Sequence, residues 1–350
     1  APPPARNAAP ARQVAPATAP RHQASPPTAA RNTAAARNAG PTGAKQPNLT
    51  ARVDEGAATL AVDAGAQKRV SSRLAQILVE RIHKGKLNLP AMPVAARECL
   101  RMLDAPDQGL DRVAKVIAKD PIIAPQVMRR AGSALLGRAN AVRTIEQAVA
   151  RLGVRELRAI IVDLSARKLF ESKNAAIRKL TKNLWEHSIA VGVLARALAK
   201  HTRELDPEIA YLAGLLHDVG KPVAASLLLE TERTMDANEA WLTSDAWLGI
   251  INECHREVGV ALARSWELHE DVLLAIARSE RYTTDNPRSP ASVVCFANAL
   301  AKRAGIYPGP VDQAVNGALL REGQKLFKVD DGVVAGFLTE LRNEGYASGG

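Results

Sequence analysis

Aromatic residues are scarce in this chain of 350 residues, since tryptophan, tyrosine and phenylalanine together make up 3% of it. Stacking of unpaired bases needs exposed aromatic rings, so this composition disfavours a base-stacking nucleic-acid surface. Apolar residues nevertheless amount to 47%, which is enough for a core built mainly from leucine, alanine, valine and isoleucine. The length allows two domains, or one large domain with a tail.

Cysteine is also rare. Cys99, Cys254 and Cys295 lie far apart and are odd in number. No two of them have the spacing of a metal clip. We interpret them as reduced, buried thiols, which predicts a cytoplasmic protein.

Long apolar runs are missing as well. No run of about 18 residues is apolar and free of charge, so we expect no membrane span. The first 50 residues also lack the apolar core of about 7–15 residues that a signal peptide carries.

Acidic residues are absent before Asp54. The first 50 residues hold ten of the 21 prolines, 16 alanines, five arginines and one lysine. With almost no large apolar side chain, such a segment cannot offset its ordering entropy, so we predict a disordered basic arm over residues 1–69. The arm supplies more than half of the net charge of +11. It is most simply a soluble spacer, but it could also bind nucleic acid or an acidic lipid surface.

The rest of the chain has helical periodicity from about Val70 to Leu341, and no stretch alternates convincingly as a strand would. This predicts an all-α fold. Capping signals support it: Gln147 follows Thr144 at the spacing of a capping box, and Asp206 precedes a proline. Gly153 is expected to break a helix.

The most informative stretch runs from Ala210 to Leu228. An apolar helix should end at His217 and Asp218, with Gly220 and the following proline as stop signals. An earlier helix that opens near Leu184 carries His187. Adjacent helix positions point about 100° apart, but His217 and Asp218 can still converge on one metal if the earlier helix supplies a further ligand.

Imidazole and carboxylate ligands suit Mn, Fe, Zn or Ni, and Lys221 could meet a phosphate as a point charge. The alternative is a buried polar cluster without metal, in which the histidines satisfy Asp218 and lock the helices together.

Several segments, taken in order, resemble the HDOD domain, the HD-related output domain of bacterial signalling proteins within the HD superfamily of metal-dependent phosphohydrolases. The resemblance covers about Leu87 to Ala304. It rests on the His217–Pro222 stretch, on His187, and on these further segments: Leu89–Pro93, Lys119–Pro121, Met128–Gly137, Thr144–Val149, Leu152–Arg158, Glu253–Gly259 and Trp266–Leu268.

This resemblance implies an HDOD-like helical fold, with an N-terminal helical subdomain at residues 70–180 and an HD-like subdomain with C-terminal helices at residues 181–345. It implies a divalent metal held by His187, His217 and Asp218, with His255 as a weaker candidate. It also implies a regulatory module rather than an enzyme, with histidine kinases, response regulators or cyclic-di-GMP enzymes as partners.

Two departures from the HD enzymes favour a site without turnover. Asn298 stands where catalytic members of the superfamily have an aspartate, and an amide oxygen is a weaker, uncharged ligand. The branch that cleaves cyclic di-GMP carries a His-His pair and a Gly-Tyr-Pro motif, which this chain lacks. We therefore expect a non-catalytic signalling module that acts by protein–protein interaction. The alternative is a metal-dependent phosphohydrolase acting on a nucleotide or cyclic dinucleotide, with Lys221 on the phosphate.

Arginine is concentrated between residues 129 and 158. The simplest interpretation is a solvated face, but guanidinium groups also match phosphates and acidic partners. The candidates for such a basic surface are Arg129, Arg130, Arg155 and Arg158.

Overall fold

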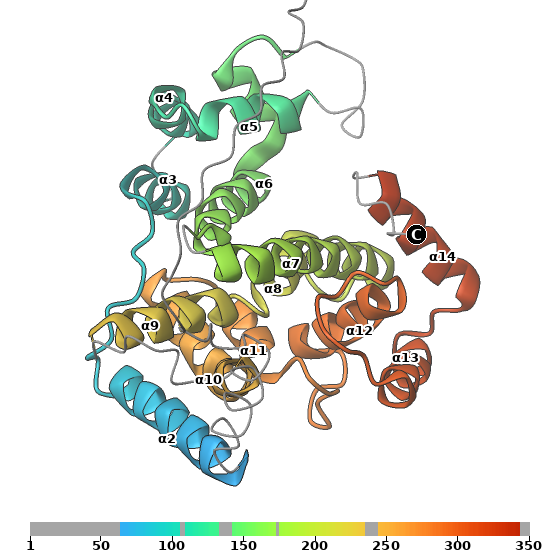
Figure 1. Cartoon of the computed structure of the whole chain (residues 1–350). Coiled ribbons are helices and arrows are strands. Elements are labelled where there is room, and N and C mark those ends of the chain that lie inside the picture. The colour runs from blue at the N-terminus through green and yellow to red at the C-terminus, as the bar shows by residue number, and fades with distance from the viewer. Residues whose placement is uncertain (1–63, 106–108, 133–141, 173–174, 235–243, 344–350) are drawn as a thin grey trace, which may run out of the picture. The chain divides into compact units, whose positions relative to one another are not determined.

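The structure is a computed structural model that describes residues 64–105, 109–132, 142–172, 175–234 and 244–343 (Figure 1). These residues form helices and short connections, with no strand among them, which confirms the all-α prediction. They belong to one compact unit that begins at Thr59. Residues 1–63 of the predicted basic arm lie outside the described residues.

The first part of the described chain forms five α-helices of 9 to 23 residues and one 3-10 helix. They are α2 (Ala64–His83), α3 (Val94–Asp104), α4 (Leu110–Lys119), α5 (Ile123–Ala131), α6 (Ile145–Arg167) and the 3-10 helix η2 (Lys168–Phe170). Helices α3 to α6 pack on one another around buried side chains such as Val113, Ile117 and Leu157. Gly153 has a φ of 71° and kinks α6, as its position in the sequence predicts.

Helix α2 begins at Ala64, earlier than the expected start near Val70, and packs elsewhere. It lies against α10 (Ser244–Ser265), where the Ser71 hydroxyl donates to the Ala246 carbonyl at 3.4 Å and the Ser72 hydroxyl donates to Glu253 at 3.1 Å. Its partner is therefore distant in sequence. The division into subdomains at residue 180 stays a prediction.

In the rest of the described chain the central helix is α7 (Ala175–Thr202), which is buried at every position from 187 to 199 (Figure 1). It packs against α8 (Pro207–Leu216), α12 (Pro290–Arg303) and α14 (Asp331–Asn343). The others are α9 (Gly220–Thr234), α11 (Glu270–Arg278) and α13 (Gln313–Phe327). A helix buried on all sides provides the rigid support that a precise polar site needs.

Two predicted caps are present. The Asp206 carboxylate accepts from the backbone N–H groups of Glu208 and Ile209 at 2.9 and 3.2 Å, which caps α8. The Thr144 hydroxyl accepts from the Gln147 N–H at 3.3 Å, which caps α6. Both caps satisfy N–H groups that the first turn of a helix leaves without partners.

The role expected of Gly220 was wrong. It does not stop a helix in a left-handed conformation, because α8 ends at Leu216 and Gly220 is the first residue of α9. What requires glycine is a close helix crossing: a Cβ on this residue would overlap the carbonyl oxygen of His255 on α10. The missing side chain lets α9 begin against α10.

One helical segment, Pro207–Thr231, is long and apolar enough to cross a membrane by length and composition alone. It comprises α8, the turn after it and most of α9, and 78% of its most apolar window is buried inside the protein. A central core helix has the same composition, so the segment is weak support for a membrane span.

Candidate metal and ligand site

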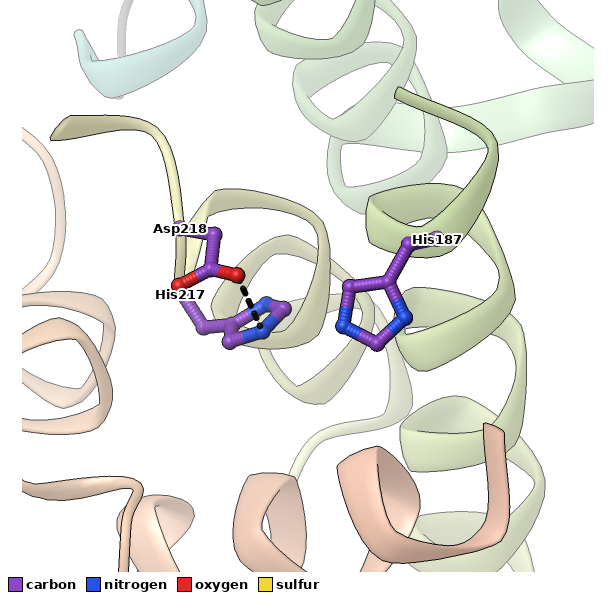
Figure 2. Close-up of side chains that lie close together, drawn as sticks. All are labelled: His187, His217 and Asp218. Carbon is purple, nitrogen blue, oxygen red and sulfur yellow. Dashed lines mark ion pairs between the residues drawn. The ribbon is translucent and has the colours of Figure 1, made fainter. Parts of the chain in front are cut away.

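Three predicted site residues meet where α7 faces the turn between α8 and α9. Figure 2 shows His187 on α7 opposite His217 and Asp218 in the turn. One ligand atom from each of the three lies within 4.8 Å of the others, and all three residues are buried. The sequence-based prediction thus names side chains that the fold brings together.

Glycine residues allow the helices that carry these side chains to approach one another closely. A Cβ on Gly214 of α8 would lie 2.7 Å from the carbonyl oxygen of Val191 on α7, closer than real Cβ contacts. The backbones of α7 and α8 therefore nearly touch one turn away from His187. On the other side of the turn, Gly220 holds α9 against α10 and brings His255 to the same place.

Backbone carbonyl groups orient all three histidine rings. The Nδ1 atoms of His187, His217 and His255 lie 2.7, 2.8 and 2.9 Å from the carbonyl oxygens of Ile306, Gly214 and Asn252. A neutral ring that donates through Nδ1 keeps a lone pair on Nε2. The Nε2 atoms of His187 and His217 are buried and have no hydrogen-bond partner in the described structure. This arrangement is the one that prepares a histidine to hold a metal.

Asp218 lies at the centre of the group. Its carboxylate is 2.6 Å from the Lys221 ammonium, 3.4 Å from Nε2 of His217 and 3.6 Å from Nε2 of His255. Burial alone would raise the pKa of the Asp218 carboxyl, but the neighbouring His217 and Lys221 hold it well below its ordinary value. Asp218 is therefore an anion inside the protein, balanced first by a lysine.

Burial keeps two of the histidines neutral. It lowers the pKa of His187 to about 3 and that of His255 to about 4. A neutral imidazole is the form that binds a metal.

A cavity of about 410 Å³ opens beside these residues. His217, Asp218, Lys221 and His255 form one wall of it. Asn298 of α12 lines it too, at the place where the resemblance expects an aspartate in catalytic relatives, and its Oδ1 atom is buried without a hydrogen-bond partner in the described structure. The cavity therefore exposes a carboxylate, imidazole nitrogens and an amide to one enclosed space.

Residues 89–282 match the HDOD domain family, more than half of the chain. The chain belongs to this family. This chain is also 28% identical over 241 residues to an uncharacterized protein of Treponema pallidum (strain Nichols), a match that covers 65% of this chain. The chain spans 44% of that relative's length, which is less than half.

Solved structures show the same fold. A candidate metal-dependent phosphohydrolase from Shewanella amazonensis SB2B has 21% sequence identity and a TM-score of 0.60, over 78% of this chain and 98% of that one. An HDOD domain protein of unknown function from Geobacter sulfurreducens has 23% identity and a TM-score of 0.53, over 78% and 97% of the two chains. At these identities the likeness establishes the HDOD-like helical fold.

The residues present fit a single divalent ion. Two buried Nε2 atoms without partners and one carboxylate give three donors within reach of each other, and His255 adds a fourth at the edge. Two features limit the fit. Lys221 already occupies one oxygen of Asp218, and Asn298 brings no charge. A pair of metal ions would need more carboxylates than this group contains.

Several residues of the cavity escaped the sequence analysis. Among them are Lys302 of α12, Tyr307 in the connection after it, and Asn316 of α13. Lys302 stands four positions after Asn298 and thus on the same face of α12, a spacing that could have revealed it. Tyr307 and Asn316 carry no such signal, because a loop and the next helix bring them to the cavity.

The predicted basic surface consists mostly of paired arginines. Arg130 lies 2.6 Å from Glu156, Arg155 lies 2.7 Å from Asp206, and Arg158 pairs with Asp104. Arg129 is exposed. A phosphate would have to compete with these carboxylates, so a binding role for this surface stays a prediction.

A second polar group is buried where α5 and α6 meet α7 and α8. We call it the seam cluster; its members are Arg130, Glu156, Asp163, Arg196, Glu208 and Tyr211. The Arg196 guanidinium lies 4.1 Å above the Tyr211 ring and 3.7 Å from Glu208. The Tyr211 hydroxyl donates to Asp163 at 3.0 Å.

The acids of the seam cluster outnumber its arginines, and burial sets their protonation. It raises the pKa of Glu208 to about 7 and also raises the pKa of Asp163. Asp163 is paired, because it accepts a hydrogen bond from the Tyr211 hydroxyl. These residues join helices and meet no histidine, so they form a structural group apart from the metal candidate.

Proposed function

We propose that this HDOD domain is a signal-transduction module that regulates through binding and does not turn over a substrate. The observation that supports this is the charge at the centre of the site. Asp218 is the single carboxylate among the histidines, and Lys221 pairs with it at 2.6 Å. The other acid of the cavity wall, Glu280, is paired with Arg256.

Hydrolysis of a phosphoester needs an activated water and a base to take its proton. A general base works best when its pKa lies near the working pH. The pKa values of His187 and His255 lie far below that range, and Asn298 cannot accept a proton. The group is thus better suited to hold a ligand than to drive a proton transfer.

The regulatory role requires partner proteins. Following the family resemblance, we propose histidine kinases, response regulators or cyclic-di-GMP enzymes in the cytoplasm. The three buried free cysteines support a reducing compartment, where thiols stay unpaired.

The test is metal content and turnover measured on the full chain. The wild type, His217→Ala and Asp218→Ala would be purified in parallel, analysed for bound metal, and assayed on phosphomonoesters, nucleotides and cyclic dinucleotides with added Mn, Fe, Zn or Ni. We expect no metal-dependent phosphate release above the level of the Asp218→Ala variant. Release by the wild type that both variants lose would contradict the proposal.

One observation favours a second candidate, a metal-dependent phosphohydrolase. Three imidazole rings are oriented by backbone carbonyls through Nδ1, and the Nε2 atoms of His217 and His255 face Asp218. This is the preparation that a resident metal requires. In that case His187, His217 and Asp218 would hold one ion, with His255 beside it, and the ion would supply Lewis acidity toward a phosphoryl oxygen. Stoichiometric metal together with turnover in the same assay would establish this candidate.

A further inference from the structure

The wall of the cavity that faces the histidines comes from the C-terminal part of the fold. Lys302, Tyr307 and Asn316 lie on α12, in the following connection and on α13. All three lie beyond residues 89–282, which match the HDOD family. This wall is therefore a feature of this chain that the family match does not describe.

The cavity has a surplus of positive charge. Lys221 and Arg256 are paired with Asp218 and Glu280, so both carboxylates of the wall are occupied. Lys302 has no ion pair in the described structure, and its ammonium lies 4.8 Å from the centre of the Tyr307 ring. Burial lowers the pKa of Lys302, which shows that water stabilises this ammonium less than usual. A half-buried cation without a carboxylate attracts an anion.

Tyr307 holds the cationic side of the cavity in place. Its ring lies below both ammonium groups, at 4.8 Å from Lys302 and 5.9 Å from Lys221, and its edge meets the His187 ring at 5.0 Å between centroids. Contacts of a cation with an aromatic face orient the cation without neutralising it. The Lys302 ammonium therefore keeps its charge for a ligand, whereas Lys221 shares its charge with Asp218.

The side-chain oxygen of Asn316 is a hydrogen-bond acceptor that no donor of the described structure occupies. Its side chain is 5% exposed, and its amide nitrogen donates to the Ala299 carbonyl at 3.2 Å. Its Oδ1 atom is buried and has no partner among the described residues. An unpaired buried acceptor costs about 1–3 kcal/mol, so a ligand that brings an O–H or N–H group to Asn316 gains by satisfying it.

We propose that this cavity binds a phosphate monoester of mononucleotide size, with its phosphoryl group at Lys302, Lys221 and Arg256 and a hydroxyl or amino group at Asn316. The inference rests on the proposed function, because it names the ligand that a binding site without turnover would take. A volume of about 410 Å³ lies near the lower end of the roughly 300–1,000 Å³ typical of ligand pockets. It accommodates one nucleotide better than a cyclic dinucleotide.

A metal ion without a phosphate fits the charge of this cavity less well than a phosphate does. The three cationic side chains of the cavity, Lys221, Arg256 and Lys302, outnumber its two carboxylates, Asp218 and Glu280. A further cation adds to that excess, whereas a dianionic phosphate reverses it. The phosphoryl oxygens also offer the bidentate geometry that the Arg256 guanidinium prefers.

The experiment is calorimetric titration of the full chain with AMP, GMP, cyclic di-GMP and inorganic phosphate in the presence of EDTA. We expect AMP or GMP to bind at one site, more tightly than inorganic phosphate and cyclic di-GMP. Lys302→Gln should weaken this binding about tenfold or more, since a charge-assisted hydrogen bond of about 1.5–3 kcal/mol is lost. Lys325→Gln, an exposed lysine of α13, is the matched control and should leave it unchanged.

Asn316→Leu adds a second, independent measurement. It should reduce the affinity for the mononucleotide to that for inorganic phosphate, and a melting curve verifies that the variant is folded. Absence of AMP and GMP binding, or equal affinities of the Lys302 and Lys325 variants, would overturn the inference while leaving the regulatory proposal intact. Binding followed by metal-dependent phosphate release would instead defeat the regulatory proposal and keep the ligand assignment.

Discussion

Two polar groups inside this HDOD domain are held in place by different kinds of contact. In the histidine cluster (His187, His217, Asp218 and His255), backbone carbonyls hold the rings. The Nε2 atoms of His187 and His217 make no hydrogen bond in the described structure, although that of His217 lies 3.4 Å from Asp218. In the seam cluster, arginine, carboxylate and tyrosine side chains contact one another across four helices. Each group lines a cavity, of about 410 Å³ and about 370 Å³. The difference lies in the contacts: the seam residues pair with one another across helices, whereas the histidine rings are held by backbone carbonyls.

The comparison teaches how to separate function from structure among buried polar residues. Removing one member of a network of paired charges leaves a charge uncompensated, which is costly to the fold. A mutation in a group that keeps unpartnered atoms beside a cavity should weaken ligand binding more than it lowers the free energy of unfolding. The four predictions below test this difference, beginning with the largest effect.

Gly220→Ala should break the histidine cluster by moving helices. The new Cβ would overlap the His255 carbonyl oxygen, so α9 and α10 must separate. We expect a loss of roughly 4 kcal/mol in the free energy of unfolding or failure to fold. Gly336→Ala is the control, because a Cβ there meets nothing within 4 Å in α14 and should stabilise by about 0.5–1 kcal/mol. Urea denaturation measures both, and equal stabilities would refute the close crossing.

Arg196→Met should break the seam cluster. It removes the cation between Glu208 and Tyr211 while keeping much of the side-chain volume. We expect a loss of about 3 kcal/mol, because a buried acid remains without compensation. The matched change Arg155→Met, in an ion pair whose arginine is 79% exposed, should cost less than about 1 kcal/mol. Similar losses in both variants would show that the seam cluster is no more than a surface network.

The histidine cluster should make the protein sensitive to acid. The pKa of His187 is about 3 when folded and near 6.5 when unfolded, so below pH 6.5 the unfolded chain takes up a proton that the folded chain refuses. The stabilising contribution is complete above pH 6.5 and is lost as the pH falls toward 3. At pH 5 the loss is roughly 2 kcal/mol.

The measurement compares unfolding free energies at pH 5 and pH 7.5 in EDTA. The wild type should lose roughly 2 kcal/mol more than His187→Gln. The exposed His83→Gln variant should follow the wild type. A wild type and a His187→Gln variant with the same pH dependence would mean that His187 is not buried as a neutral ring.

The seam cluster should respond to pH in the opposite direction. The pKa of Glu208 is raised to about 7 in the folded protein, so between pH 5 and 8 the folded state binds more protons than the unfolded state. Its contribution is present at low pH and is lost as the pH rises through 7. Because the Glu208 side chain is 17% exposed and solvent screens part of the effect, we expect roughly 1 kcal/mol.

Glu208→Gln should remove this loss between pH 5 and 8, and the exposed Glu186→Gln should not. Thermal melting across that range measures the difference. A steeper loss in Glu208→Gln than in the wild type would contradict the assignment of the proton to Glu208.

The local structure and four residues of the site could be predicted from the sequence alone. Periodicity and caps such as Thr144 and Asp206 determine local structure, because helix formation and capping depend on residues only a few positions apart. The resemblance to the HDOD family selected His187, His217, Asp218 and His255, and the structure places all four together.

Only the tertiary structure decided the rest. The role of Gly220 depends on α10, about 35 residues later in the chain, and the partners of the arginines and of α2 are equally distant. The cavity wall of Lys302, Tyr307 and Asn316 exists because a loop and another helix bring these residues opposite Asp218. The charge that each buried group carries also depends on burial and on neighbours far apart in the chain, which the order of residues does not reveal.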